Sequence, residues 1–371
     1  MLNHDLTIRI LKTASSYLIE ELKIEESIIE RLRNAYLGLE QNKLDSWLDT
    51  KSKQEIALPV ENLDCKNYDE VEDIKQGLMN NRWAFEKIKG SKVIAFDTSE
   101  MFSHHITPYF ILVNTGYFFY DYFHGEYLEN SIPLFFTKKQ IEDLIEETKL
   151  PSWILQYMRL DCYSQVFSEL LEKQDLSGAY VFLDESISSG FLSSARDDVI
   201  KKLMNKLLQN LEEMINSNTI PIAIFYSMSR SFVNFLSKVS NLNDVKVTDK
   251  QLFDRILKPG QRSPLMKIYN HPTSLINREV YAFYLKIFDG NVLRVEFLGD
   301  LKGRIDEIHK IVLLQSIIGD GYPYCMARAH EQAYLSEQDR RFILSLLSNQ
   351  LPGISPIMMS KKLERKLSSL I

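Results

Sequence analysis

The segment VIAFDTS, residues 93–99, places an aspartate directly after a run of apolar residues. The segment YVFLDES, residues 180–186, repeats the arrangement with a second aspartate. Short apolar runs rich in valine, isoleucine and phenylalanine are typical of buried strands. We therefore expect Asp97 and Asp184 to lie at the tips of two strands of an α/β fold, where a metal ion and a substrate can reach both carboxylates.

A third group suited to this chemistry is His330, which follows the segment Gly321-Tyr322-Pro323 near the C-terminus. Two strand-end carboxylates with a helical group added later suit divalent-metal phosphodiester chemistry. Carboxylate oxygens favour Mg²⁺ or Mn²⁺. The alternatives are a turn or helix N-cap role for each aspartate, and a structural core role for the histidine.

Composition sets the broad class of the protein. The 371 residues are 45% hydrophobic, enough for a large core in one or two domains, and no apolar run is long enough to span a membrane. Three widely spaced cysteines predict a reducing, cytoplasmic location and argue against a structural zinc site. The formal net charge of −6 does not indicate nucleic-acid binding, but basic residues confined to one groove would still allow such binding.

The order of predicted elements favours an RNase H-like core, a mixed sheet with flanking helices, plus N-terminal helices and a C-terminal helical extension. We expect three regions: 1–90, with two helices in 6–48 and a connector over 49–80; a core over 91–350; and a helical tail over 351–371. The expected strands are 92–97, 107–114, 117–123, 126–134, 179–184, 220–226, 279–287 and 292–298, and the expected core helices are 138–148, 152–174, 195–217, 304–318, 324–335 and 337–349.

Five segments occur in one order along the chain: Asp97-Thr98-Ser99, Asp184-Glu185-Ser186, the segment 226–231, Arg294-Val295-Glu296-Phe297, and Gly321-Tyr322-Pro323 followed by Ala329-His330. With these segments the chain resembles the NurA nucleases, the partners of HerA-type hexameric DNA translocases. The eight-residue step from tyrosine to histidine is kept (330 − 322 = 8). The chain departs from the family pattern at Thr98 and Glu185, which replace glycines, and at Arg230, which replaces lysine.

The resemblance implies a Mn²⁺- or Mg²⁺-dependent 5′→3′ DNA exonuclease with some single-strand endonuclease activity. It further implies a homodimer docked on a HerA-like hexameric ATPase, acting in DNA end resection and repair or in defence against phage. Since no Walker A motif is present in the sequence, ATP-driven movement along DNA would come from that partner. The rival interpretation is a catalytically weak adaptor that keeps the fold, docks on the translocase and guides DNA.

The resemblance also assigns residues to the site. The family has an acidic ligand on the helix before the second aspartate strand, which we assign to Glu169, with Glu172 and Glu185 as alternatives. Metal ligands would then be Asp97, Glu169, Asp184 and His330, with Tyr322 orienting a water or contacting a phosphate, or else serving as an anchoring aromatic. Phosphate contacts are expected from Arg230, Arg262 and Arg294, although an ion pair between Arg294 and Glu296 fits the sequence equally well.

Overall fold

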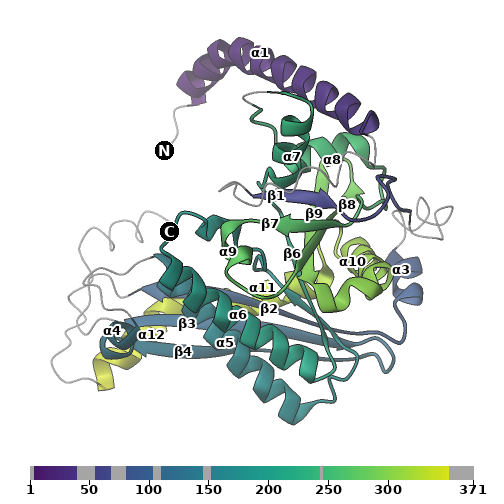
Figure 1. Cartoon of the computed structure of the whole chain (residues 1–371). Coiled ribbons are helices and arrows are strands. Elements are labelled where there is room, and N and C mark those ends of the chain that lie inside the picture. Colours follow the sequence, from purple (N-terminus) through teal and green to yellow (C-terminus); the bar gives the residue numbers. More distant parts are fainter. Residues whose placement is uncertain are drawn as a thin grey trace. The chain divides into compact units, whose positions relative to one another are not determined.

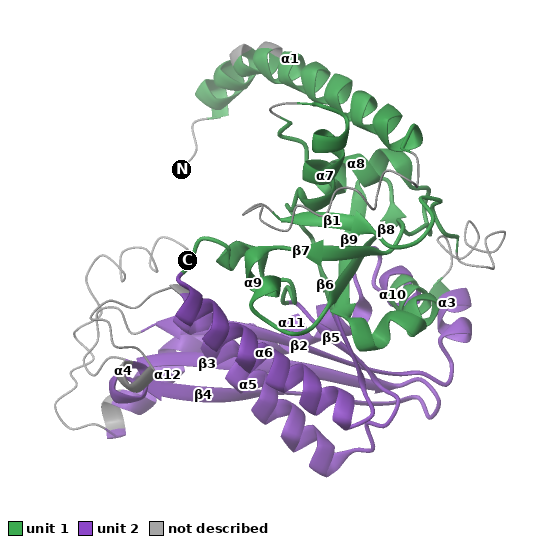
Figure 2. Ribbon diagram, viewed as in Figure 1, with its two compact units in different colours: residues 1–81, 185–195, 223–313 green, residues 82–184, 196–222, 314–371 purple. Residues whose placement is uncertain are grey.

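The computed structural model describes residues 4–39, 55–67, 81–102, 110–144, 152–242 and 245–350. The chain divides into two compact units (Figure 2). Unit 1 comprises residues 1–81, 185–195 and 223–313, and unit 2 comprises residues 82–184, 196–222 and 314–371. The expected tail over 351–371 lies outside the described residues. No helix within the described ranges combines the length and the apolar character that crossing a bilayer requires.

Unit 2 is built on an antiparallel meander of β2 (Lys92–Phe102), β3 (Phe110–Asp121) and β4 (Glu126–Thr137). Strand β5 (Tyr180–Leu183) pairs with β2 in parallel, from Val93↔Tyr180 to Phe96↔Leu183. The first half of β6 (Ile220–Phe225) follows, and the Ile220 amide donates to the Ala179 carbonyl at 2.9 Å. This order, β4-β3-β2-β5-β6, confirms the mixed sheet of the predicted RNase H-like core.

Two expectations about these strands are wrong. Strand β2 continues to Phe102, so Asp97 lies inside a strand and not at its tip. The expected strands 107–114 and 117–123 form one strand, β3, because Asn114, Thr115 and Gly116 stay paired with both neighbouring strands. Gly116, inside this strand, allows a close contact with a helix.

Helices cover both faces of the unit 2 strands (Figure 1). One face carries α5 (Ser152–Lys173), which packs beside α6 (Asp197–Asn216), and the Phe96 and Tyr163 rings lie 5.8 Å apart beneath α5. The other face carries α11 (Tyr324–Ala333), which contacts β2 and β3. The remaining helices of this unit are α3 (Asn81–Lys87), α4 (Lys138–Leu144) and α12 (Glu337–Gln350). Because both faces are covered, β3 is buried along almost its whole length.

Unit 1 contains an antiparallel run of strands in the order β1-β7-β8-β9-β6. Its strands are β1 (Ile56–Pro59), β7 (Met266–Tyr269), β8 (Val280–Phe288), β9 (Asn291–Leu298) and the second half of β6. The expected strands 279–287 and 292–298 correspond to β8 and β9, and their hairpin turns at residues 289–290. The expected irregular connector over 49–80 is partly wrong, because residues 56–59 form β1 and are buried against β7.

The helices of unit 1 are α1 (His4–Leu37), α7 (Ser231–Val239), α8 (Asp249–Ile256), α9 (His271–Ser274), the short 3₁₀ helices η3 (Gly190–Leu192) and η4 (Gly299–Arg304), and the first part of α10 (Ile305–Ile318). Helix α1 is unbroken over 34 residues, where two helices were expected in 6–48. No proline or glycine interrupts it, so nothing in the backbone forces a break. Its last turns bury Ile29, Leu32 and Tyr36 against α7 and α8.

Candidate functional site

The centre of the candidate site is a contact between β2 and α11. The Nδ1 atom of His330 lies 2.5 Å from the Oδ2 atom of Asp97, a short hydrogen-bond distance. The Asp97 side chain is 18% exposed and the His330 side chain is 71% exposed, so the pair is open to solvent on the histidine side. A carboxylate and an imidazole are thus held together at an accessible surface of unit 2.

Strand register places Asp184 beside this pair. Phe96 and Leu183 are the last partners of the parallel ladder between β2 and β5, and the two aspartates are the next residues of each chain. Neighbouring residues of parallel strands share one face of the sheet, and successive residues alternate between faces. Phe96 faces α5, so Asp97, the next residue of β2, faces α11, and Asp184 directly follows the end of β5.

Gly116 explains why α11 can lie so close to the strands. It is the partner of Asp97 in the ladder between β2 and β3. A Cβ atom at this position would lie 2.2 Å from the Ala333 amide nitrogen and 2.4 Å from the Ala329 carbonyl oxygen. Only a residue without a side chain fits there, and this close approach brings His330, on the same helix, to Asp97.

The structure does not bring Glu169 to this pair. Glu169 lies on α5, the helix that covers Phe96, whereas Asp97 points to the opposite face and contacts α11. Its carboxylate forms an exposed ion pair with Lys173 one helical turn later, at 3.3 Å. The alternative Glu172 is exposed on the same helix, and the alternative Glu185 belongs to unit 1.

Tyr322 is half-buried in the turn before α11, whereas His330 lies near the end of that helix. The six residues from Tyr324 to His330 correspond to a rise of roughly 9 Å at about 1.5 Å per residue. Tyr322 therefore lies before the N-terminal end of α11 and His330 near its C-terminal end, so the closing segment does not bring these two residues to one point.

In unit 1, Arg294 is part of a buried ionic network. Its guanidinium lies 2.7 Å from the Glu296 carboxylate and 2.9 Å from that of Glu55, and Arg294 and Glu296 are almost fully buried. Burial alone would raise the pKa of Glu55, but the charge of Arg294 together with hydrogen bonds from Asn270, Ser229 and Arg294 lowers that pKa below its ordinary value. The contacts support the ion-pair alternative for Arg294, and they satisfy its charge within the protein.

The other two arginines differ in exposure. Arg262 is buried and forms ion pairs with Glu61 and, at 3.6 Å, with Asp306. Arg230 is exposed, and its Nη1 donates to the Val245 carbonyl at 3.2 Å. Arg230 borders a cavity of about 490 Å³, which is lined by serines 186, 188, 193, 227 and 229, by Asn234 and by Phe191, among others. Of the three predicted phosphate contacts, only Arg230 presents its guanidinium at the surface.

The sequence contains one signal for the close approach of α11. An isolated glycine within a strand pattern indicates either a bulge or the close approach of another backbone, and here the second applies to Gly116. Within the described ranges, no group of three or more His, Cys, Asp or Glu side chains is arranged to hold a metal ion.

The mixed sheet with helices on both faces makes unit 2 an α/β fold, and the Asp97–His330 contact lies on its α11 face. The NurA domain family matches residues 92–335, about two thirds of the chain. The chain belongs to the NurA family. This confirms the resemblance seen in the five ordered segments.

The chain is also similar to solved structures of other proteins. The crystal structure of the NurA nuclease from Sulfolobus solfataricus is 18% identical, with a TM-score of 0.49, and the match covers 78% of this chain and 98% of that chain. A structure of NurA bound to dAMP and manganese is 11% identical, with a TM-score of 0.41, and covers 76% of this chain and 96% of that one. None of the curated proteins matches the chain in sequence.

Proposed function

We propose that this protein is a DNA nuclease that depends on a divalent metal ion. Family membership supports a nuclease. The site residues are identified by the 2.5 Å contact between Asp97 and His330. Asp184 is the residue that follows the last β2–β5 pair, Phe96 and Leu183. Asp97 and His330 meet on the α11 face of the unit 2 sheet, and Asp184 directly follows β5, the strand beside β2.

The donor atoms of this set fit Mn²⁺ or Mg²⁺. Carboxylate oxygens are the ligands that both ions prefer, and such ions usually keep waters and bind substrate phosphates when the protein supplies only one or two carboxylates. The bound ion would lower the pKa of a water and neutralise charge on the scissile phosphate. Asp97 and Asp184 would hold it, and His330, with one nitrogen on Asp97, would complete the ligand set or move a proton.

We further propose the finer features that the family resemblance implies. The activity would be a 5′→3′ exonuclease with some single-strand endonuclease activity, in DNA end resection or phage defence. Arg230 would contact a DNA phosphate, because its guanidinium is exposed beside a serine-lined cavity. Tyr322 would orient a water or a phosphate before α11. A HerA-like hexameric ATPase would move the DNA.

Helix α1 supports association, in a homodimer or with the translocase. Its last turns are buried in unit 1, but the large apolar side chains before them are each more than half exposed: Leu6, Ile8, Ile10, Leu11, Tyr17, Leu18, Ile19, Leu22 and Ile24. Soluble monomers rarely expose so continuous an apolar surface, and such surfaces mark interaction sites. We propose that this exposed face of α1 lies in an interface.

The test is cleavage of end-labelled single- and double-stranded DNA with Mn²⁺. Asp97→Ala or Asp184→Ala should abolish cleavage and leave the melting temperature unchanged or higher, because removing a carboxylate from a cluster of like charges relieves repulsion. His330→Ala should lower turnover about 10²–10⁴-fold without loss of DNA binding in the absence of metal.

Glu169→Ala serves as the matched control, since it removes a carboxylate on the opposite face and should retain cleavage. Near wild-type cleavage by Asp97→Ala or Asp184→Ala would show that the site is misassigned. If the wild-type protein binds DNA and a translocase but does not cleave under any of these conditions, the adaptor function replaces the nuclease.

A further inference from the structure

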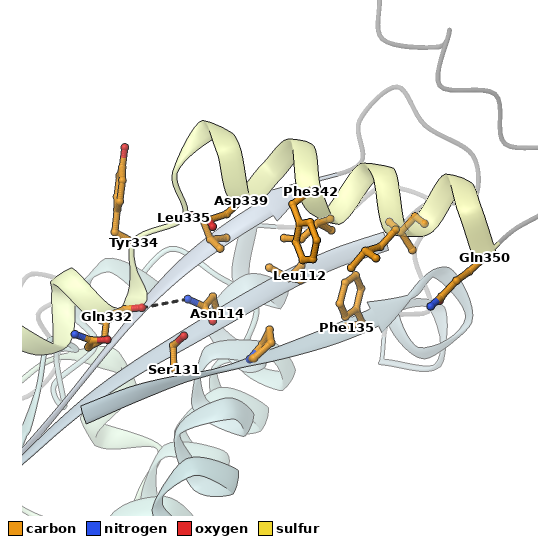
Figure 3. Close-up of a pocket in the computed structure, with 14 residues that line it drawn as sticks. Leu112, Asn114, Ser131, Phe135, Gln332, Tyr334, Leu335, Asp339, Phe342 and Gln350 are labelled. Atoms are coloured by element: carbon orange, nitrogen blue, oxygen red, sulfur yellow. Dashed lines mark hydrogen bonds between the residues drawn. The ribbon is translucent and has the colours of Figure 1, made fainter. Parts of the chain in front are cut away.

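Helix α11 is held at both ends by buried amide side chains. At its C-terminal end, the Asn114 Nδ2 atom donates to the Ala333 carbonyl at 2.9 Å. The same atom lies 3.4 Å from the Gln332 carbonyl oxygen, a contact drawn as a dashed line in Figure 3. At its N-terminal end, the Cys325 amide donates to the Gln315 Oε1 atom at 3.0 Å. The Gln315 Nε2 atom in turn donates to the Tyr122 hydroxyl at 2.7 Å.

These bonds satisfy groups that a helix leaves open. The first N–H groups and the last C=O groups of an α-helix have no partner within the helix. Asn114 and Gln315 provide such partners from elements that α11 packs against, and both are buried. Each amide therefore ties one end of α11 to unit 2 through a directional bond, which fixes the helix along its axis as well as against the sheet.

The bond from Asn114 acts close to the candidate site. Asn114 and Gly116 are two residues apart on β3, so they share the face on which α11 lies. Gly116 is the strand partner of Asp97, and Ala333 is three residues after His330. A shift of the last turn of α11 along β3 would therefore carry the imidazole away from the Asp97 carboxylate.

We infer that Asn114 is a positioning residue for the proposed metal site, and that Gln315 has the same role at the other end of α11. The inference rests on the proposed function, and it assigns neither residue a contact with metal or DNA. Asn114 acts through the backbone of α11, which keeps His330 within hydrogen-bond distance of Asp97. Residues that orient metal ligands typically change metal affinity or activity about 10–100-fold when they are replaced.

The experiment compares Asn114→Ala with Asn210→Ala. Asn210 is a matched control in unit 2, because it is also buried and its Nδ2 atom also donates to a backbone carbonyl, that of Leu160, at 2.5 Å. Both variants should lower the melting temperature. Only Asn114→Ala should weaken Mn²⁺ binding, measured by titration calorimetry without DNA, by about tenfold or more. It should also lower kcat for DNA cleavage, with KM nearly unchanged.

Gln315→Met provides a second variant should Asn114→Ala not fold, since it keeps the side-chain volume but removes the acceptor for Cys325. It should show the same loss of Mn²⁺ affinity and kcat. The inference is overturned if the folded variants at 114 and 315 bind Mn²⁺ as the wild type does, or if Asn210→Ala weakens binding equally. A wild-type protein that neither binds Mn²⁺ nor cleaves DNA refutes the proposed function itself, and this inference with it.

Discussion

Replacing Gly116 by alanine tests the contact on which the candidate site depends. The added Cβ atom would lie 2.2 Å from the Ala333 nitrogen, and real Cβ contacts are essentially never shorter than 3.0 Å. The separation must therefore grow by at least 0.8 Å (3.0 − 2.2), and the atoms in the way belong to the helix backbone. Because no flexible side chain can yield, α11 itself has to move away from β3.

A movement of this size is large compared with the 2.5 Å contact between Asp97 and His330. Added to that contact it gives 3.3 Å (2.5 + 0.8), beyond the usual range for such a bond. Overpacking of this kind costs about 1–3 kcal/mol, and each kcal/mol lowers the melting temperature by about 2–4 °C in a domain of this size. Gly116→Ala should therefore lower both the melting temperature and the rate of Mn²⁺-dependent DNA cleavage.

Scanning calorimetry and the cleavage assay measure the two effects on the same protein. Gly303→Ala is the control, because a Cβ atom at position 303 meets nothing within 4 Å. It should leave stability and cleavage unchanged. If Gly116→Ala melts within a degree of the wild type and cleaves DNA at the same rate, α11 does not set the geometry of the site in the way described.

Two further predictions concern unit 1. The His309 Nε2 atom donates a hydrogen bond to the Gly260 carbonyl at 3.0 Å, and burial, followed by the charge of Arg262, lowers the pKa of His309 from 6.5 to about 4. The unfolded chain therefore takes up the proton first, so stability should fall as the pH drops from 6.5 towards 4, by about 2 kcal/mol at pH 5. Urea denaturation at pH 7 and pH 5 should show a smaller loss for His309→Gln; an equal loss would contradict the assignment. For α1, light scattering at micromolar concentration should report a dimer for the wild type and a monomer for the double variant Leu11→Glu, Leu18→Glu. A monomeric wild type would count against an α1 interface between two copies.

The sequence predicted the strands around both aspartates because apolar runs mark buried strands whatever their neighbours are. It predicted the order of the core elements for the same reason, and the family resemblance rests on segments that lie in those elements. The contact of His330 with Asp97 could be expected only from the family order, because 233 residues separate the two (330 − 97).

The features that the sequence did not predict depend on tertiary contacts. Glycine is common in turns, but at position 116 its role is to admit the backbone of α11. That helix lies more than 200 residues further along the chain. The segment 56–59 is short and flanked by polar residues. It forms a strand because it pairs with β7. Glu169 has the spacing of a helical ligand, but its position on α5 places it on the face opposite to Asp97.

The burial of β3 on both faces has a consequence for the growing chain on the ribosome. Strand β3 ends at Asp121, and the helix that covers one of its faces begins at Tyr324, so 202 residues lie between them (324 − 121 − 1). At a synthesis rate of about 5–20 residues per second, this interval lasts roughly 10–40 s. Throughout that time the apolar side chains of β3 lack their α11 cover. The late position of α11 in the chain thus leaves this strand open to a chaperone, or to a temporary neighbour, for the whole of that interval.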